Sequence, residues 1–173
     1  MVAGVGNVFL GDDGFGVAVA QRLAAESLPE GARAADFGIR GVHLAYELMN
    51  GYEGLVLVDA MRRGEAPGTV YVLEPDGVTQ ELPGPGGATA PAMDAHDMAP
   101  ETVLTVLRRL GVRLPWVTVV GCEPAALEEE MGLTPPVLGA VDVAVRLVRE
   151  LLEERMDRGD PAAAERGTDG SHA

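Results

Sequence analysis

Apolar residues along the chain follow two different periodicities, which predict strands and helices in alternation. Leu55–Val58 is a run of four apolar residues, typical of a strand buried on both faces of a parallel sheet. Between Phe15 and Leu23, and again between Val137 and Arg155, apolar residues recur every three or four positions, as on one face of a helix. Further strands are predicted at 2–5, 32–37, 69–73 and 116–120, and further helices at 42–49 and 100–110. This alternation favours an α/β fold, with a mostly parallel sheet between helices.

Two segments depart from this pattern. Residues 74–98 are rich in Gly and Pro, and a connection of that length is usually either functional or disordered. Residues 156–173 contain no Val, Ile, Leu or aromatic residue, so they have little to bury in a core. We therefore expect a single domain at 1–155, followed by a disordered tail at 156–173.

Charge and composition limit the choice of partners. The chain has 13 cationic residues, all of them Arg, against 27 acidic ones, and its net charge is −14. Nucleic acids and anionic membranes attract proteins with clustered cations, so neither is an expected partner. Cys122 is the only cysteine, and the first residues lack the charged and apolar regions of a signal peptide. We expect a cytoplasmic monomer.

Glycines and acids gather between the first strand and the first helix. Gly4 and Gly6 match the start of a dinucleotide-binding fingerprint, but its third glycine is replaced by Phe9. Asp12 and Asp13 also lie where a phosphate would meet the helix N-terminus, which is electrostatically unfavourable. Two interpretations remain open for these acids: they cap the helix that follows, or they belong to a functional site.

Asp13, Asp59 and His96 are the candidate metal-binding residues. Asp59 directly follows a buried strand, and ligands of open α/β sheets bind at such carboxyl ends. His96 lies in the long loop, between Asp94 and Asp97. Two carboxylates and one imidazole suit a divalent transition metal with open coordination positions. The alternatives are that Asp59 caps a turn and that His96 is solvated.

Cys122 is the remaining candidate nucleophile. It follows an apolar strand, and a catalytic thiol needs a nearby base such as His43 or His96. The sequence contains no zinc-protease helix motif and no nucleophile elbow. We interpret Cys122 as a buried packing residue.

The motifs together resemble the hydrogenase maturation proteases. The opening pattern of this family, Gly-x-Gly-Asn followed by apolar residues and an acidic pair, corresponds to residues 4–13 here. An Asp-Ala pair followed by Pro-Gly-Thr corresponds to 59–69, and a loop histidine before a helix corresponds to His96. Gly-x-x-Pro at 121–124 and Gly-Leu-Thr-Pro at 132–135 complete the match. The resemblance extends from Val2 to about Leu152.

This resemblance implies a three-layer α/β/α fold with about five strands and an endopeptidase activity. Such an enzyme removes the C-terminal extension from the large-subunit precursor of a [NiFe]-hydrogenase after nickel insertion. The family's metal-contacting residues correspond to Asp13, Asp59 and His96, which would also be the catalytic residues. The nickel is then supplied by the precursor, which is the expected partner. The family has more apolar residues before its first glycine, so we expect the natural start upstream of Met1.

Two other functions remain as alternatives. The first is a nucleotide-binding α/β domain, which the failed glycine spacing and the acidic loop argue against. The second is a noncatalytic nickel-recognising chaperone or scaffold that uses the same three residues. A cleavage assay separates this scaffold from the protease.

Overall fold

A computed structural model describes residues 1–74, 105, 111–112 and 114–157. Five strands form one sheet in the order β2-β1-β3-β5-β4. All neighbouring strands are parallel except β4, which is antiparallel to β5. The strands are β1 (Val2–Val5), β2 (Ala34–Gly38), β3 (Gly54–Ala60), β4 (Val70–Leu73) and β5 (Trp116–Cys122).

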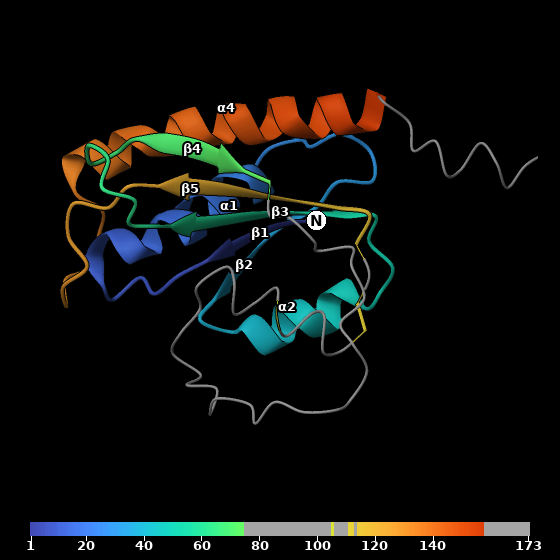
Figure 1. Cartoon of the computed structure of the whole chain (residues 1–173), viewed down its shortest axis with the longest axis horizontal. Helices are drawn as coiled ribbons and strands as arrows, with labels where there is room; N and C mark the ends of the chain where they lie inside the picture. Colours follow the sequence, from blue (N-terminus) through green and yellow to red (C-terminus); the bar gives the residue numbers. More distant parts are fainter. Residues whose placement is uncertain (75–104, 106–110, 113, 158–173) are drawn as a thin grey trace, which may run out of the picture.

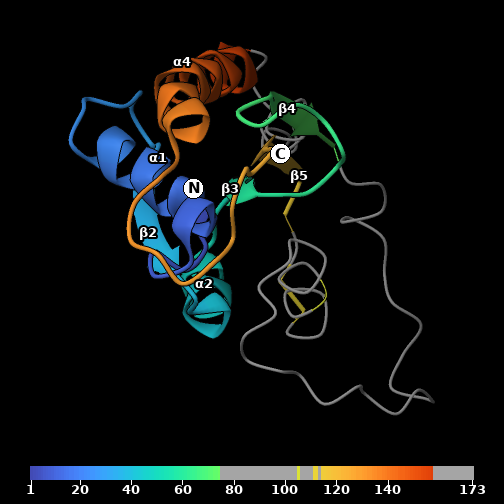
Figure 2. The ribbon, with the colours of Figure 1, turned by 90° about the vertical axis from the view of Figure 1, so that its left-hand side faces the viewer.

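Helices lie on both faces of this sheet (Figure 1). The helical elements are η1 (Gly11–Gly14), a short 3₁₀ helix, α1 (Phe15–Ala24), α2 (Gly41–Leu48) and α4 (Pro135–Asp157). The turned view in Figure 2 shows α1 and α4 together on one side and α2 on the other. The three-layer α/β/α prediction is therefore confirmed, with five strands. Helix α4 continues two residues into the predicted tail, and the rest of that tail lies outside the described residues.

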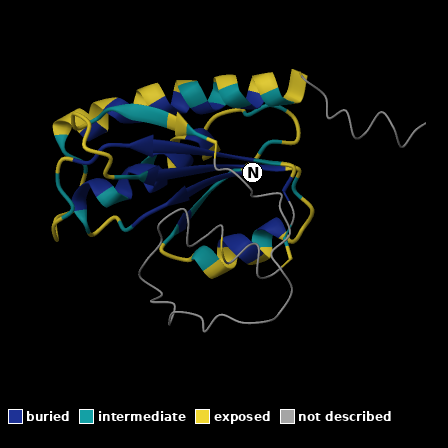
Figure 3. Cartoon of the chain, viewed as in Figure 1, coloured by how far each residue is buried: buried dark blue, intermediate teal, exposed yellow. Residues whose placement is uncertain are grey.

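The sheet separates two hydrophobic cores, and the central strands are buried on both faces (Figure 3). Leu55 and Leu57 pack in the core that contains Leu44 of α2. Val56 and Val58 point the opposite way and pack in the core formed with α1 and α4. All four residues of Leu55–Val58 are fully buried, as the apolar run predicted for a central strand.

Two glycines bring α1 unusually close to the sheet. A Cβ atom on Gly16 would lie 2.1 Å from the carbonyl oxygen of Val58 and 2.4 Å from that of Val5. On the facing strand, a Cβ atom on Gly4 would lie 2.1 Å from the carbonyl oxygen of Gly16. No larger side chain fits between these backbones, so the glycines set the distance between α1 and strands β1 and β3.

The predicted helix at 100–110 and the long loop at 74–98 fall almost entirely outside the described residues. The remaining predicted elements are present within one to two residues of their expected bounds. They include the strand predicted at 32–37, which forms β2 at the edge of the sheet.

Candidate functional site

The carboxyl ends of β1 and β3 meet at the point where the sheet changes its winding direction. From β1 the chain crosses to β2 on one side, and it then returns past β1 to form β3 on the other. Ligands of open α/β sheets bind at such a switch point, outside the carboxyl ends of the strands. Asp13 follows β1 and Asp59 lies near the end of β3, so both predicted acids belong to this edge.

Asp13 is held on η1 by a tight turn. The Asn7 N–H donates to Asp13 Oδ2 at 2.6 Å, and η1 itself packs against β3. Gly6 has φ +128°, and a Cβ atom there would lie 1.8 Å from the carbonyl oxygen of Asp13. Only glycine therefore permits this close approach of the two backbone segments. Burial raises the pKa of Asp13, and the Asn7 N–H offsets part of this shift.

Asp59 is a buried carboxylic acid at the end of a central strand. Only 5% of the residue is exposed, and its paired residue on the adjacent strand β5 is Gly121. Because side chains alternate along a strand, Asp59 lies on the same face as Leu57, the face that α2 covers. A buried acid is unusual in a protein core and is typical of a functional or structural site.

The third predicted residue, His96, lies outside the described residues. Within the described ranges, no three His, Cys, Asp or Glu side chains are grouped so as to hold a metal ion. The structure thus brings Asp13 and Asp59 to one edge of the sheet, and the three-residue site remains a prediction.

Asp12 does not cap a helix, and both of its carboxylate oxygens are already occupied by hydrogen bonds within the protein. The N-terminal residues of η1 and α1 form no side-chain capping hydrogen bond. Instead, the fully buried Asp12 carboxylate binds the segment after β5. Oδ2 accepts hydrogen bonds from the N–H groups of Ala125 (2.8 Å) and Ala126 (3.0 Å) and from the Thr134 hydroxyl (2.9 Å). Oδ1 accepts the Thr134 N–H at 2.7 Å.

These hydrogen bonds decide the charge of Asp12. Burial alone would raise the pKa of this carboxyl, but the donors from Ala126, Thr134 and Ala125 outweigh it and lower the pKa below its ordinary value. Asp12 therefore stays ionised and holds the segment 125–134 against η1, the element that carries Asp13. The capping interpretation is wrong for Asp12, whose partners lie more than 100 residues away in the chain.

Cys122 is a packing residue, as its position after an apolar strand predicted. The side chain is fully buried in the core that α1 and α4 cover. Burial, with the nearby Asp12 and Glu123 carboxylates, raises the pKa of the Cys122 thiol to about 12. A thiol that stays protonated at neutral pH is a poor nucleophile, which argues against a cysteine mechanism.

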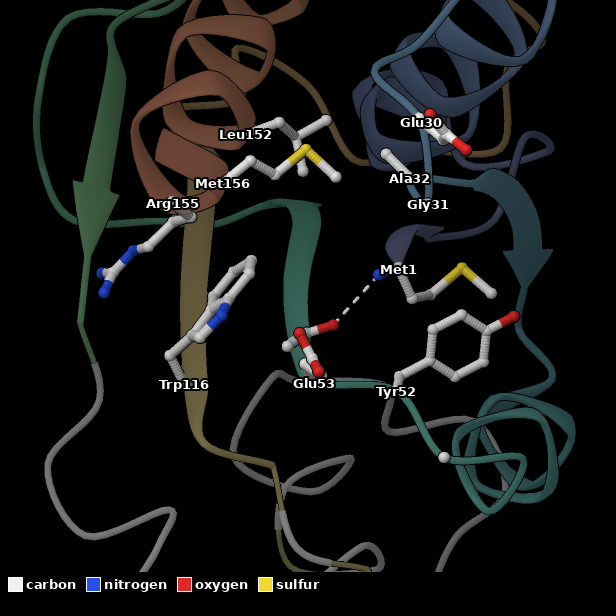
Figure 4. A pocket seen from close by; sticks show the side chains of 12 residues that line it. Met1, Glu30, Gly31, Ala32, Tyr52, Glu53, Trp116, Leu152, Arg155 and Met156 are labelled. Carbon is white, nitrogen blue, oxygen red and sulfur yellow. Dashed lines mark hydrogen bonds between the residues drawn. The ribbon is translucent and has the colours of Figure 1, made fainter. Parts of the chain in front are cut away.

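A separate cavity of about 590 Å³ lies at the opposite edge of the sheet (Figure 4). Met1, Tyr52, Trp116 and Arg155 are among its lining residues, and the Arg155 guanidinium lies 5.2 Å from the centre of the Trp116 ring. Trp116 begins β5, so this cavity is at the amino ends of the strands, away from Asp59. It is not part of the candidate site.

Comparison with known proteins identifies the family. The family model for hydrogenase maturation proteases matches residues 17–151. The chain belongs to the hydrogenase maturation protease family. Hydrogenase expression/formation protein HupD of Rhodobacter capsulatus is 34% identical over 154 residues, which cover 87% of this chain and 70% of HupD. Hydrogenase 2 maturation protease of Escherichia coli is 31% identical over 156 residues, which cover 89% of this chain and 90% of that protein.

A solved structure of the same family supports the fold in three dimensions. The hydrogenase maturating endopeptidase HybD of Escherichia coli superposes with a TM-score of 0.70 at 30% identity, over 89% of this chain and 91% of that one. The protein is therefore a hydrolase of the maturation protease family, in agreement with the resemblance of its motifs. Among the described residues, no helix is long and apolar enough to cross a membrane.

Proposed function

We propose that this protease removes the C-terminal extension from the large-subunit precursor of a [NiFe]-hydrogenase after nickel has been inserted. In this proposal Asp13, Asp59 and His96 contact the nickel that the precursor carries. The observation that supports it is the position of two acids, the half-buried Asp13 and the buried Asp59, at the same edge of the sheet beside its switch point. Membership of the family rests on the fold of the whole chain, whereas the proposed contact with nickel rests on these three residues.

The electrostatics of Asp13 support a cation as part of the substrate. Burial raises the pKa of this carboxyl, so its ionised form is poorly stabilised by its surroundings. A divalent cation brought in by the precursor would favour the ionised form and would in turn be bound by it. Carboxylates and a neutral imidazole are suitable ligands for such a metal. The precursor without nickel lacks this interaction, which makes cleavage depend on completed nickel insertion.

A cleavage assay with nickel-loaded and nickel-free precursor tests this proposal. We expect cleavage of the loaded precursor only, and loss of cleavage in the Asp59→Asn and His96→Ala proteins. Asp142→Asn is a matched control, because Asp142 is exposed on α4 and its ion pair with Arg22 lies at the surface. Equal cleavage of both precursors, or full activity of His96→Ala, would exclude recognition of the metal. Binding of the loaded precursor without any cleavage would instead support the scaffold alternative.

We further propose that the protein acts as a monomer in the cytoplasm. The single cysteine is buried, so no disulfide contributes to the described structure. Light scattering after size-exclusion chromatography tests the oligomeric state, and a mass near 18.0 kDa is expected. A stable dimer at micromolar concentration would contradict this part of the proposal.

A further inference from the structure

Glu123 lies beside Asp59 at the carboxyl edge of the sheet. Strand β5 ends at Cys122, whose partner across the sheet is Ala60, and Asp59 pairs with Gly121. Glu123 is therefore the first residue beyond β5 at the level where the chain leaves β3. Only 5% of Glu123 is exposed. A buried carboxylate requires partners, and here they come from the segment that follows Asp59.

The Glu123 carboxylate binds two backbone N–H groups of the segment 61–64. Oε2 accepts the Arg63 N–H at 2.7 Å, and Oε1 accepts the Gly64 N–H at 3.3 Å. The hydrogen bond from the Arg63 N–H lowers the pKa of Glu123, and neighbouring N–H groups lower it further. Burial acts in the opposite direction but does not outweigh these hydrogen bonds. The carboxylate is therefore ionised at neutral pH, and its bonds to the segment are charge-assisted.

The backbone of Glu123 holds the other end of the same connection. The Glu123 N–H donates to the Thr69 carbonyl at 2.9 Å, and the Gly68 N–H donates to the Glu123 carbonyl at 2.8 Å. One residue thus contacts the chain both where it leaves β3 and where it enters β4. The β3–β4 connection, residues 61–69, is fixed at both ends by Glu123.

Tyr71 of β4 restrains the same segment from the other side. Its hydroxyl donates to the Met61 carbonyl, and the Met61 N–H donates to the Cys122 carbonyl at 2.9 Å. The Arg63 guanidinium lies 5.5 Å from the centre of the Tyr71 ring. The ring also fills the space above Gly121, where a Cβ atom would lie 2.2 Å from it. Met61, two residues after Asp59, is therefore held through both its N–H and its carbonyl.

We propose that Glu123 is a positioning residue of the protease, which orients Asp59 by fixing the segment 61–64 through its carboxylate. This inference rests on the role given to Asp59 in the proposed function. Only Ala60 separates Asp59 from Met61, which Tyr71 holds, and the Arg63 N–H that the Glu123 carboxylate holds lies four residues after Asp59. A shift of this segment therefore moves the end of β3 directly. Displacements of about 1 Å at a reacting centre reduce rates by roughly 100-fold, so a modest loosening has a measurable effect.

The Glu123→Gln protein tests this role with little change in shape. The amide keeps one oxygen but directs its NH₂ group at a backbone N–H, so one of the two hydrogen bonds is lost. With nickel-loaded precursor we expect kcat to fall roughly 10- to 100-fold while KM changes less than about two-fold. The amide protons of Arg63 and Gly64 should exchange faster, and those of β1 should not. Glu128→Gln is the matched control, because its exposed side chain forms no hydrogen bond or ion pair in the described structure; its kcat should stay within about two-fold of the wild-type value.

A double-variant cycle with Tyr71→Phe tests whether the two side chains act on the same segment. If they do, the loss in the double variant should be smaller than the product of the two single losses. Measurements at least 20 °C below each variant's melting temperature keep a loss of stability from mimicking a loss of positioning.

The outcomes separate this inference from the proposed function. Wild-type protein that fails to cleave loaded precursor contradicts the proposed function itself. Suppose instead that the wild-type protein cleaves the precursor and that the kcat of Glu123→Gln stays within two-fold of the wild-type value, although the amides of Arg63 and Gly64 exchange faster. That result overturns only the positioning role. A loss of kcat that disappears on cooling also overturns it, because Glu123 would then act through global stability alone.

Discussion

Replacing Asp12 by Asn should weaken the folded state strongly, because one buried carboxylate holds four donors. In the best orientation the amide oxygen takes the place of Oδ2 and keeps the donors from Ala125, Ala126 and the Thr134 hydroxyl. The amide NH₂ then faces the Thr134 N–H, which loses its acceptor at Oδ1. The change thus removes one charge-assisted hydrogen bond and weakens three others.

The expected loss follows from the strength of these bonds. A hydrogen bond to a charged group contributes about 1.5–3 kcal/mol, against about 1 kcal/mol for a neutral one. One lost and three weakened bonds, less the burial cost that the neutral amide avoids, predict a loss of about 2–4 kcal/mol. For a protein of this size that corresponds to a fall in melting temperature of roughly 5–15 °C.

The pH dependence of the stability tests the same reasoning, because the direction of the pKa shift fixes whether the contribution of Asp12 is lost at low or at high pH. The folded-state pKa of Asp12 lies below its ordinary value, so the stability that the carboxylate contributes is present above the unfolded pKa, near 3.9. It is lost as the pH falls from there through the folded-state pKa. The difference in unfolding free energy between the wild-type and Asp12→Asn proteins should therefore be largest at pH 7 and should narrow below about pH 4.

Urea unfolding followed by circular dichroism from pH 7 to pH 3 measures this difference. Asp142→Asn serves as the control, since the Asp142 side chain is 63% exposed and a surface ion pair contributes only about 0–1 kcal/mol. A loss below about 0.5 kcal/mol for Asp12→Asn at pH 7, or a difference that does not change with pH, would refute the assignment of Asp12 as the clamp on 125–134.

Substitutions at three further positions test the site and the core. Asp13→Asn should abolish cleavage without loss of stability at pH 7, because the raised pKa of Asp13 means that its ionised form does not stabilise the fold. Asp13→Glu should keep some cleavage. A folded Asp13→Asn protein with full activity would contradict this prediction. Cys122→Ala should cleave normally with a stability loss of about 1 kcal/mol, and loss of cleavage in the folded variant would indicate a thiol mechanism. Thr118→Val should stabilise the protein by about 1 kcal/mol in thermal unfolding, because the buried Thr118 hydroxyl has no hydrogen-bond partner among the described residues; a clear loss of stability would show that it has one.

The sequence by itself determined the elements and the edge where the acids lie. Leu55–Val58 predicts a central strand because a short run of branched apolar residues suits a strand that is covered on both faces. Parallel strands end at the same edge, so an acid after β1 and another at the end of β3 were expected together. The ordered motifs also predicted the family that the comparisons confirm. These inferences depend on local periodicity and chain order, which a linear sequence records directly.

Only the tertiary structure decided which carboxylates hold the backbone segments next to the candidate site. Asp12 and Asp13 are adjacent and chemically identical, yet one is surrounded by donors from a segment 113 residues away and the other is not. Glu123 binds N–H groups 59 and 60 residues earlier in the chain. No spacing in the sequence indicates these pairs, because a backbone N–H is present at every residue except proline. Which N–H groups a buried carboxylate meets is set by the strand order and by the paths of the loops after β3 and β5.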